Sequence, residues 1–131
     1  MNALGRHLLL ELFDCELDAI NNLETVKGTL IEAAKRAQAT IVDVVFHEFN
    51  PFGVSGVVVI AESHLSIHTW PEYRYCAVDV FSCGDVLQPE IAVNYLVEAF
   101  GAARTSLVEM QRGMFLNATH PIVNKGAVAV S

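Results

Sequence analysis

Five side chains able to move protons, attack a carbonyl group or bind a metal fall within seven consecutive positions: Glu62, Ser63, His64, Ser66 and His68. They come directly after an apolar run of β-branched residues, which is typical of a buried strand. A strand that only fills a core needs no such groups, whereas site residues are often placed where a strand ends. This segment is therefore the candidate functional site.

A metal site is one chemistry that the two histidines suggest. His64 and His68 are four residues apart, and on a helix that spacing brings two imidazoles to one zinc ion. The residues between them predict a strand instead, on which positions four apart are separated by about 13 Å. One ion cannot bridge that distance, so no metal site is predicted.

Nucleophilic catalysis is a second alternative. The segment Gly53-Val54-Ser55-Gly56 lacks the G-x-S-x-G spacing and precedes a strand, whereas a nucleophile elbow joins a strand to a helix. A dyad of Ser63 and His68 would have no evident acid to orient it. Cys83 stands before Gly84 at the expected end of a strand, where a thiol is either reactive or an ordinary buried residue. Residue types alone leave these alternatives open.

The elements that would position these groups follow in the order β-α-β-β-β-β-α-β. Apolar and β-branched runs predict strands over 6–15, 40–49, 55–61, 65–70, 73–81 and 104–111. A helix is expected to begin with Asn21 as its N-cap and Glu24 completing a capping box, and to end near Gln38. A second helix is expected from Pro89 until Gly101 stops it.

This order predicts an α+β fold. Adjacent strands with short connections favour a two-layer sandwich, with a mainly antiparallel sheet and both helices on one face. The strands are apolar on both sides, so the second face of the sheet is expected to pack on another copy of the chain. From residue 112 onward no period is evident, and a tail is expected there.

Length, composition and charge exclude several classes of protein. With 131 residues the chain predicts one domain, 1–131, and its 53% hydrophobic and 18% charged residues exclude a disordered chain. A net charge of −7 without a basic patch argues against nucleic acid as a partner. No apolar run approaches the roughly 20 residues that span a bilayer, and the first residues are unlike a signal peptide. Cys15, Cys76 and Cys83 form no C-x-x-C pair, so free thiols in the cytoplasm are expected.

A resemblance to a known family indicates the function that the individual residues leave open. The segment Glu62–Glu72, with 53–56 upstream and 81–84 downstream, closely resembles the short prokaryotic S-adenosylmethionine decarboxylases, which are pyruvoyl enzymes of polyamine synthesis. The resemblance extends from Gly5 to about Gly113. It implies decarboxylation of S-adenosylmethionine to the aminopropyl donor for spermidine. The alternatives are decarboxylation of ornithine or arginine by a similar member, and a non-catalytic partner subunit.

The resemblance implies a proenzyme that cuts itself. The cut would fall between Glu62 and Ser63 and give a beta chain, 1–62, and an alpha chain, 63–131. The Ser63 hydroxyl would attack the Glu62 carbonyl, and Ser63 would then become a pyruvoyl group that forms a Schiff base with the substrate. No external cofactor is implied.

Three further residues take chemical roles by resemblance. His68 would accept the α-proton that drives the cleavage, which suits the pKa of a histidine. Ser55 would support the acyl shift, and Cys83 would return a proton to the substrate carbon after decarboxylation. A non-catalytic subunit would be expected to lack Ser63, His68 or Cys83, and all three are present.

Substrate recognition also follows by position. Phe49 would stack on the adenine and Glu72 would accept hydrogen bonds from the ribose, although core packing and a solvated turn are their ordinary roles. Trp70 would line the same pocket or belong to the core. The sites of the family lie where two protomers meet, so a homodimer of cleaved chains is expected.

Three departures from the family pattern bear on the substrate. Ser66, Arg74 and Cys76 stand where relatives commonly have threonine, glycine and alanine. Arg74 and Cys76 come just after Glu72, near the expected nucleoside site. The presence of both Phe49 and Glu72 favours S-adenosylmethionine over ornithine or arginine.

Overall fold

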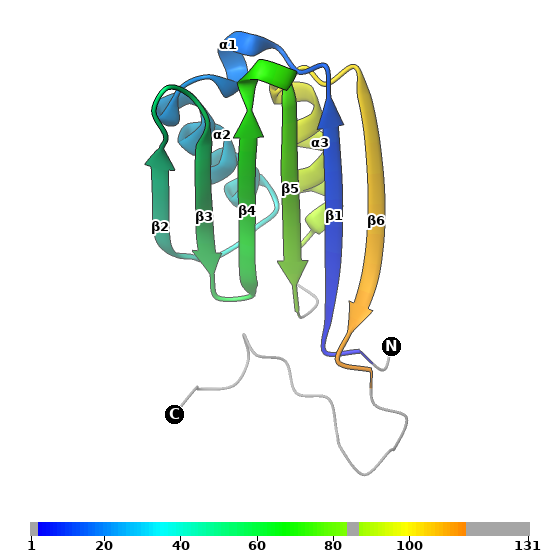
Figure 1. Ribbon diagram of the computed structural model, residues 1–131. Coiled ribbons are helices and arrows are strands. Elements are labelled where there is room, and N and C mark those ends of the chain that lie inside the picture. Colours follow the sequence, from blue (N-terminus) through cyan, green and yellow to red (C-terminus); the bar gives the residue numbers. More distant parts are fainter. Residues whose placement is uncertain (1–2, 84–86, 115–131) are drawn as a thin grey trace.

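The computed structural model describes residues 3–83 and 87–114, and its elements alternate as the sequence predicts (Figure 1). The elements are β1 (Gly5–Phe13), α1 (Leu17–Ile20), α2 (Leu23–Arg36), β2 (Ile41–Glu48), β3 (Val54–Ile60), β4 (Ser63–Trp70), the 3-10 turn η1 (Pro71–Tyr73), β5 (Tyr75–Ser82), α3 (Pro89–Ala99) and β6 (Arg104–Arg112). The tail expected from residue 112 onward begins later than predicted, because Arg112 ends β6, and residues 115–131 lie outside the described residues.

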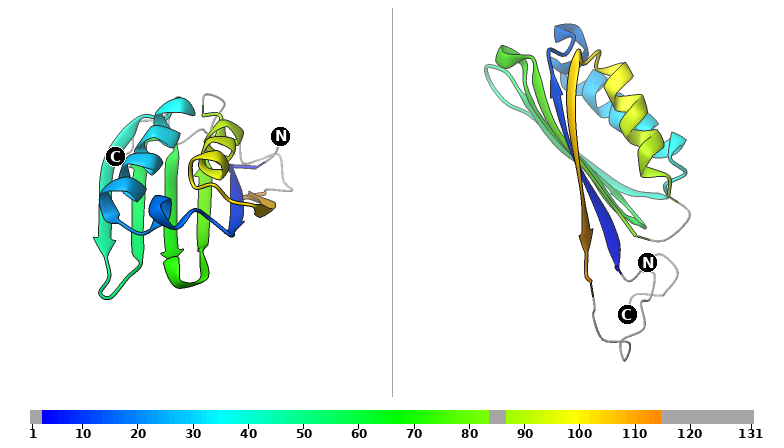
Figure 2. Two further views of the ribbon diagram at one scale, coloured as in Figure 1. Left: turned by 90° about the horizontal axis from the view of Figure 1, so that it is seen from above. Right: turned by 90° about the vertical axis from the view of Figure 1, so that its right-hand side faces the viewer.

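The six strands form one sheet in the order β2-β3-β4-β5-β1-β6, and every neighbouring pair is antiparallel. Figure 2 shows α2 and α3 together on one side of this sheet. The two-layer α+β sandwich predicted from the sequence is therefore confirmed. β1 and β6 pair at the far side of the sheet although they lie at opposite ends of the described chain.

The core lies between the helices and one face of the sheet. Alternate residues of each central strand point into it, as the two-residue period of a strand requires. α2 contributes an apolar stripe at helical spacing, and α3 contributes another. The buried residues of these elements include Leu8, Leu10, Leu12, Val58, Leu65, Ile67, Val78, Val80, Val26, Leu30, Ala33, Ala34, Ala92, Val93 and Leu96. β4 is thereby fixed in the middle of the molecule with its odd-numbered residues turned toward the helices.

Three details differ from the sequence expectation. The N-cap of α2 is Asn22, whose side chain accepts a hydrogen bond from Thr25 N at 2.8 Å. Asn21 instead ends the four-residue helix α1, which is too short to leave a periodic signal. The capping box with Glu24 is therefore wrong, because the cap is displaced by one residue. β5 begins at Tyr75 because the chain first completes η1 and passes through a left-handed residue, Arg74, at φ 51°.

The second face of the sheet is chemically mixed. It bears exposed apolar side chains, such as Leu9, Val45 and Val108. Between them stand titratable groups, so the expectation of strands that are apolar on both sides was too simple. No described helix is long and apolar enough to cross a membrane.

Candidate active site

The predicted cleavage point lies in the two-residue turn between β3 and β4. Glu62 occupies this turn, and Ser63 begins β4 opposite Ser82 of β5. Ser63 has φ 154°, which few residues other than glycine adopt, because its Cβ crowds the backbone. The bond that joins Glu62 to Ser63 is therefore held in a strained conformation.

Cys83 is the residue that closes over this turn. Its backbone N–H donates to the Glu62 carbonyl oxygen at 3.0 Å, and its thiol donates to the same oxygen at 2.8 Å. Its sulfur also lies 3.9 Å from Ser63 Oγ. The side chain is 7% exposed, so these contacts are sheltered from water. Two donors on one carbonyl oxygen are an arrangement that stabilises negative charge developing there.

A second group of predicted residues gathers at the other end of β4. Ser55 and His68 are directly opposite in the β3–β4 ladder, and a hydrogen bond of 2.8 Å joins Ser55 Oγ to His68 Nδ1. If Nδ1 donates to the hydroxyl, the other ring nitrogen keeps a lone pair that can accept a proton. The two side chains thus form a base with a partner that orients it.

A pocket of about 310 Å³ opens beside this pair. It is lined by Phe49, Phe52, Gly53, Ser55, His68, Thr69, Trp70 and Glu72. Phe49 is 49% exposed and Trp70 is 39% exposed, so neither belongs to the core. Glu72 is exposed in η1 at the rim of this pocket. Aromatic faces with one carboxylate can hold a flat, polar molecule such as a nucleoside.

The aromatic wall of the pocket at Trp70 is held in place by side chains of β5 and β1. The Trp70 ring packs on Tyr75 with a centroid distance of 5.4 Å. Tyr75 in turn donates from its hydroxyl to Glu11 Oε1 at 2.6 Å. Burial, followed by this hydrogen bond, raises the pKa of Tyr75 to about 12. Tyr75 therefore remains a neutral hydrogen-bond donor that fixes the aromatic wall.

The two groups are far apart within one chain. Ser63 and His68 are the first and sixth residues of β4, which places their Cα atoms about 16 Å apart. Because they are five positions apart, an odd offset, their side chains also point to opposite faces of the sheet. One chain therefore brings Ser63 to Cys83 and Ser55 to His68, but it does not bring Ser63 to His68.

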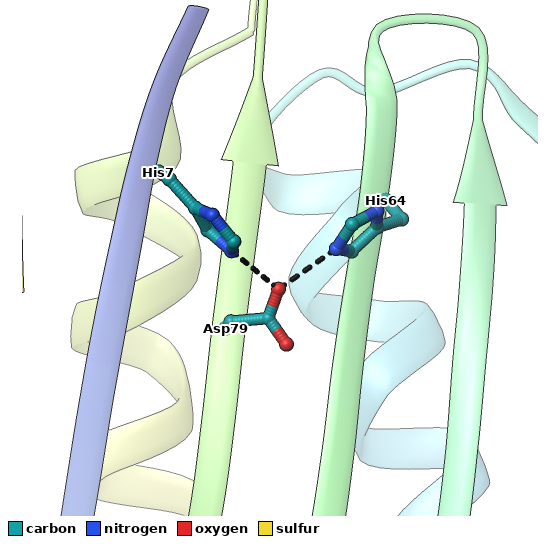
Figure 3. Close-up of side chains that lie close together, drawn as sticks. All are labelled: His7, His64 and Asp79. Carbon is teal, nitrogen blue, oxygen red and sulfur yellow. Dashed lines mark hydrogen bonds and ion pairs between the residues drawn. The ribbon is translucent and has the colours of Figure 1, made fainter. Parts of the chain in front are cut away.

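Sequence reasoning missed two features of this surface. Phe52 lines the pocket but was not predicted to do so. The sequence signal that could have identified it is its place three positions after Phe49, as a second aromatic residue in the same segment. A cluster of His7, His64 and Asp79 lies on the free face of the sheet (Figure 3). That cluster joins three strands, so it has no local sequence signal.

Comparison with known proteins agrees with this geometry. The sequence model of the S-adenosylmethionine decarboxylase family matches residues 6–113. A protein of Thermodesulfovibrio yellowstonii named S-adenosylmethionine decarboxylase proenzyme is 57% identical over 125 residues, which cover 95% of this chain and 93% of that protein. A protein of the same name from Acidithiobacillus ferrooxidans is 53% identical over 113 residues, covering 86% of this chain and 85% of the relative.

A solved structure shows the same fold. The crystal structure of the adenosylmethionine decarboxylase from Aquifex aeolicus superposes with a TM-score of 0.85 at 33% sequence identity. The superposition covers 92% of this chain and 100% of that chain. Sequence and structure thus point to the same group of proteins.

Proposed function

The chain belongs to the S-adenosylmethionine decarboxylase family, and from this membership we propose how its residues carry out the chemistry. The activity is that of a carboxy-lyase, which removes the carboxyl group of S-adenosylmethionine as carbon dioxide. The product is an aminopropyl donor for spermidine synthesis. Relatives that are 53% and 57% identical carry this name, and neither name implies ornithine, arginine or a non-catalytic role.

The proenzyme is cut between Glu62 and Ser63. Ser63 Oγ attacks the Glu62 carbonyl carbon, the peptide C–N bond breaks, and an ester joins the two residues while the Ser63 amino group becomes free. Loss of the Ser63 α-proton then expels the Glu62 carboxylate. The double bond left in residue 63 rearranges to an imine, water adds, and ammonia leaves to give a pyruvoyl group.

One observation carries this proposal: Cys83 holds the carbonyl that Ser63 must attack. Its N–H and its thiol both donate to the Glu62 oxygen, at 3.0 and 2.8 Å. Negative charge develops on that oxygen during the acyl shift, so two donors lower the barrier. The strained φ of Ser63 acts in the same direction, because breaking the peptide bond releases the strain.

The fragments remain together after the cut. The fragment 1–62 supplies β1, β2 and β3, and the fragment 63–131 supplies β4, β5 and β6. β1 pairs on one side with β5 and on the other with β6, while β3 pairs with β4. Separation would break three antiparallel ladders, so the cleaved chain keeps its fold.

Residues around the cut fit the pyruvoyl group that the family name implies. When formed at residue 63, the group supplies a carbonyl that captures the substrate amino group and accepts the electrons left by carbon dioxide. Cys83 lies 3.9 Å from Ser63 Oγ and is buried, so its thiol is the group placed to return a proton to the substrate carbon. The low exposure of Cys83 also keeps water from doing so in its place.

The pocket binds the nucleoside part of the substrate. Phe49 presents an exposed ring on which adenine stacks, and stacking of a base on an aromatic ring contributes about 1–3 kcal/mol. Glu72 accepts hydrogen bonds from the ribose hydroxyls at the pocket rim. His68, oriented by Ser55, accepts the proton that the elimination step releases.

The complete site requires two chains, and we therefore propose a homodimer. Within one chain, His68 is about 16 Å from Ser63 and points to the other face. Two chains related by a two-fold axis would set the pocket end of one chain against the cleavage end of the other. Each dimer would then contain two sites, and each site would use residues of both chains.

The cytoplasm is the proposed location. All three cysteines, Cys15, Cys76 and Cys83, are buried free thiols. Unpaired thiols suit a reducing compartment.

The mass of the denatured protein tests this proposal. The chain should separate into two fragments that meet at residues 62 and 63, and Ser63→Ala should stay whole and inactive. Ser66→Ala, which removes another hydroxyl of the same strand, should still be cut. Cleavage of the Ser63→Ala chain at the same bond would refute the scheme.

A further inference from the structure

Three titratable side chains converge at the centre of the free sheet face. His7 of β1 and His64 of β4 lie opposite the same residue, Phe81 of β5. Their rings pack on the Phe81 ring with centroid distances of 5.0 and 5.8 Å. Both then reach along β5 to Asp79, as Figure 3 shows.

The three side chains point their donor atoms at one place. His7 Nε2 and His64 Nε2 each lie 2.7 Å from Asp79 Oδ2. All three atoms fall within 4.8 Å of one another. A tetrahedral zinc ion bonds nitrogen and oxygen at about 2.0–2.2 Å and so needs ligand atoms about 3.4 Å apart. The observed spacings, from 2.7 Å to at most 4.8 Å, lie on either side of this value.

The cluster is also held in place by neighbours that do not bind the ion. Ser66 donates a hydrogen bond to Asp79 Oδ1, the oxygen that the histidines leave free. The carboxylate is therefore oriented by a second contact, as metal-binding carboxylates commonly are.

We propose that His7, His64 and Asp79 bind a divalent transition-metal ion, of which Zn²⁺ fits the donors best. Two imidazole nitrogens and one carboxylate oxygen match the preferences of zinc, and a fourth position stays open for water or another ligand. The sequence expectation of no metal site considered only His64 with His68. The site proposed here uses residues that the sheet brings together.

The ion would tie three strands of the sheet together. His7 belongs to the fragment 1–62, whereas His64 and Asp79 belong to 63–131. If the proposed cleavage takes place, the ion joins the two products, but the binding itself does not depend on that cleavage. The role is structural, because the three side chains point to the free face, opposite to that of Ser63, and none of them lines the nucleoside pocket.

Substitution of Arg112 provides a test in which metal binding should become stronger, whereas loss of a ligand should weaken it. Its Nη1 lies 3.4 Å from His7 Nδ1. In the structure His7 Nε2 donates to Asp79 and Nδ1 accepts from Arg112. When His7 binds a metal through Nε2, its ring proton moves to Nδ1, which can then no longer accept from this cation. Arg112 therefore opposes binding, and its removal should strengthen it. β6 is exposed along its length, so Arg112→Ala is expected to fold normally.

The experiment titrates the full chain, stripped with a chelator, with Co²⁺ and then with Zn²⁺. The protein should bind one Co²⁺ per chain, with the visible absorption of a site with four or five ligands, and Zn²⁺ should displace it. His64→Gln and Asp79→Asn should weaken Zn²⁺ binding at least about tenfold. Affinity should also fall as pH drops through the histidine range, because protons compete for the nitrogens.

His47→Gln is the matched control. His47 is an exposed histidine opposite Ser55 on the same sheet face, outside the cluster, and its loss should leave Zn²⁺ affinity unchanged. Arg112→Ala should raise the affinity several-fold, and this readout stands even if a ligand variant fails to fold. No Co²⁺ spectrum in the native chain, equal affinity in His64→Gln and His47→Gln, or weaker binding in Arg112→Ala would overturn the proposal.

Discussion

The two ends of β4 offer different chemistry. At the Ser63 end a strained peptide bond, a carbonyl with two donors and a buried thiol are packed tightly together. At the His68 end an oriented imidazole faces an open pocket with aromatic walls. In the function proposed above, bonds break and form at the first end, and the second end holds a ligand and accepts a proton.

The contrast teaches that one continuous motif can serve two places. Residues 62–72 form a single run in the sequence, yet the strand carries its ends about 16 Å apart and to opposite faces. Neither end is a complete site. If the account is right, substitutions at the two ends should fail in different ways, and both failures can be measured separately.

Cys83→Ala should have the larger effect on the reaction. The thiol is the proposed proton donor, so kcat should fall by about 10²- to 10⁴-fold with little change in KM. Cleavage should still occur, because the backbone N–H of residue 83 continues to hold the Glu62 carbonyl, but it should be slower by tenfold or more. Time courses of cleavage and steady-state kinetics of the cleaved enzyme provide both readouts. Full turnover in this variant would remove Cys83 from the role of acid.

Glu72→Ala should affect binding at the opposite end. Loss of charge-assisted hydrogen bonds to the ribose, worth about 1.5–3 kcal/mol, should raise KM by about 10- to 100-fold. Cleavage should proceed at the normal rate, since Glu72 has no proposed part in the acyl shift or the elimination. Glu98→Ala on the exposed side of α3 is the control and should change neither quantity. A cleavage defect in Glu72→Ala would contradict the assignment of Glu72 to substrate binding alone.

Asp79 of β5 pairs with Ser66, between the two ends of β4. Its ionisation should change the free energy of unfolding, and this is the smallest of the expected effects. Its pKa is lowered to about 2 in the folded protein, below the value of about 3.9 for a free aspartate. The ionised form therefore stabilises the fold above about pH 4, and this contribution disappears as pH falls toward 2. After allowance for its partial exposure it amounts to about 1–2 kcal/mol.

Thermal unfolding of the native chain and of Asp79→Asn measures this contribution of Asp79 to stability. With metal removed, the native chain should be the more stable at neutral pH. The gap between the two should narrow as the pH is lowered from about 4 toward 2. A gap that stays constant over that range would contradict the assignment of this titration to Asp79.

Much of the fold was predictable because its signals are local. Apolar runs and helix stops located six strands and two helices within a few residues. The errors arose where a single residue decides the boundary. Asn21 and Asn22 are equally good caps by type, and only the preceding turn of helix, α1, determines that Asn22 caps α2.

Candidate site residues could be named from the sequence, but their arrangement could not. The roles of Ser63, His68 and Cys83 came from resemblance and stay predictions. Contact between Cys83 and the Glu62 carbonyl depends on the register of β4 with β5, which no local pattern contains. The cluster at Asp79 shows the same limit, since His7 lies 72 residues away in the chain.

Mixed dimers test the central claim, which is that each active site combines the Ser63 end of β4 in one chain with the His68 end of β4 in its partner. Ser63→Ala and His68→Ala chains with different tags would be produced separately and together, and hybrid dimers would be isolated through both tags. Each variant alone should stay whole. In the hybrid, the His68→Ala chain should be cut, because it keeps Ser63 and meets the partner's His68. A His68→Ala chain that stays whole in isolated hybrids, or that is cut at the normal rate when alone, would contradict the account.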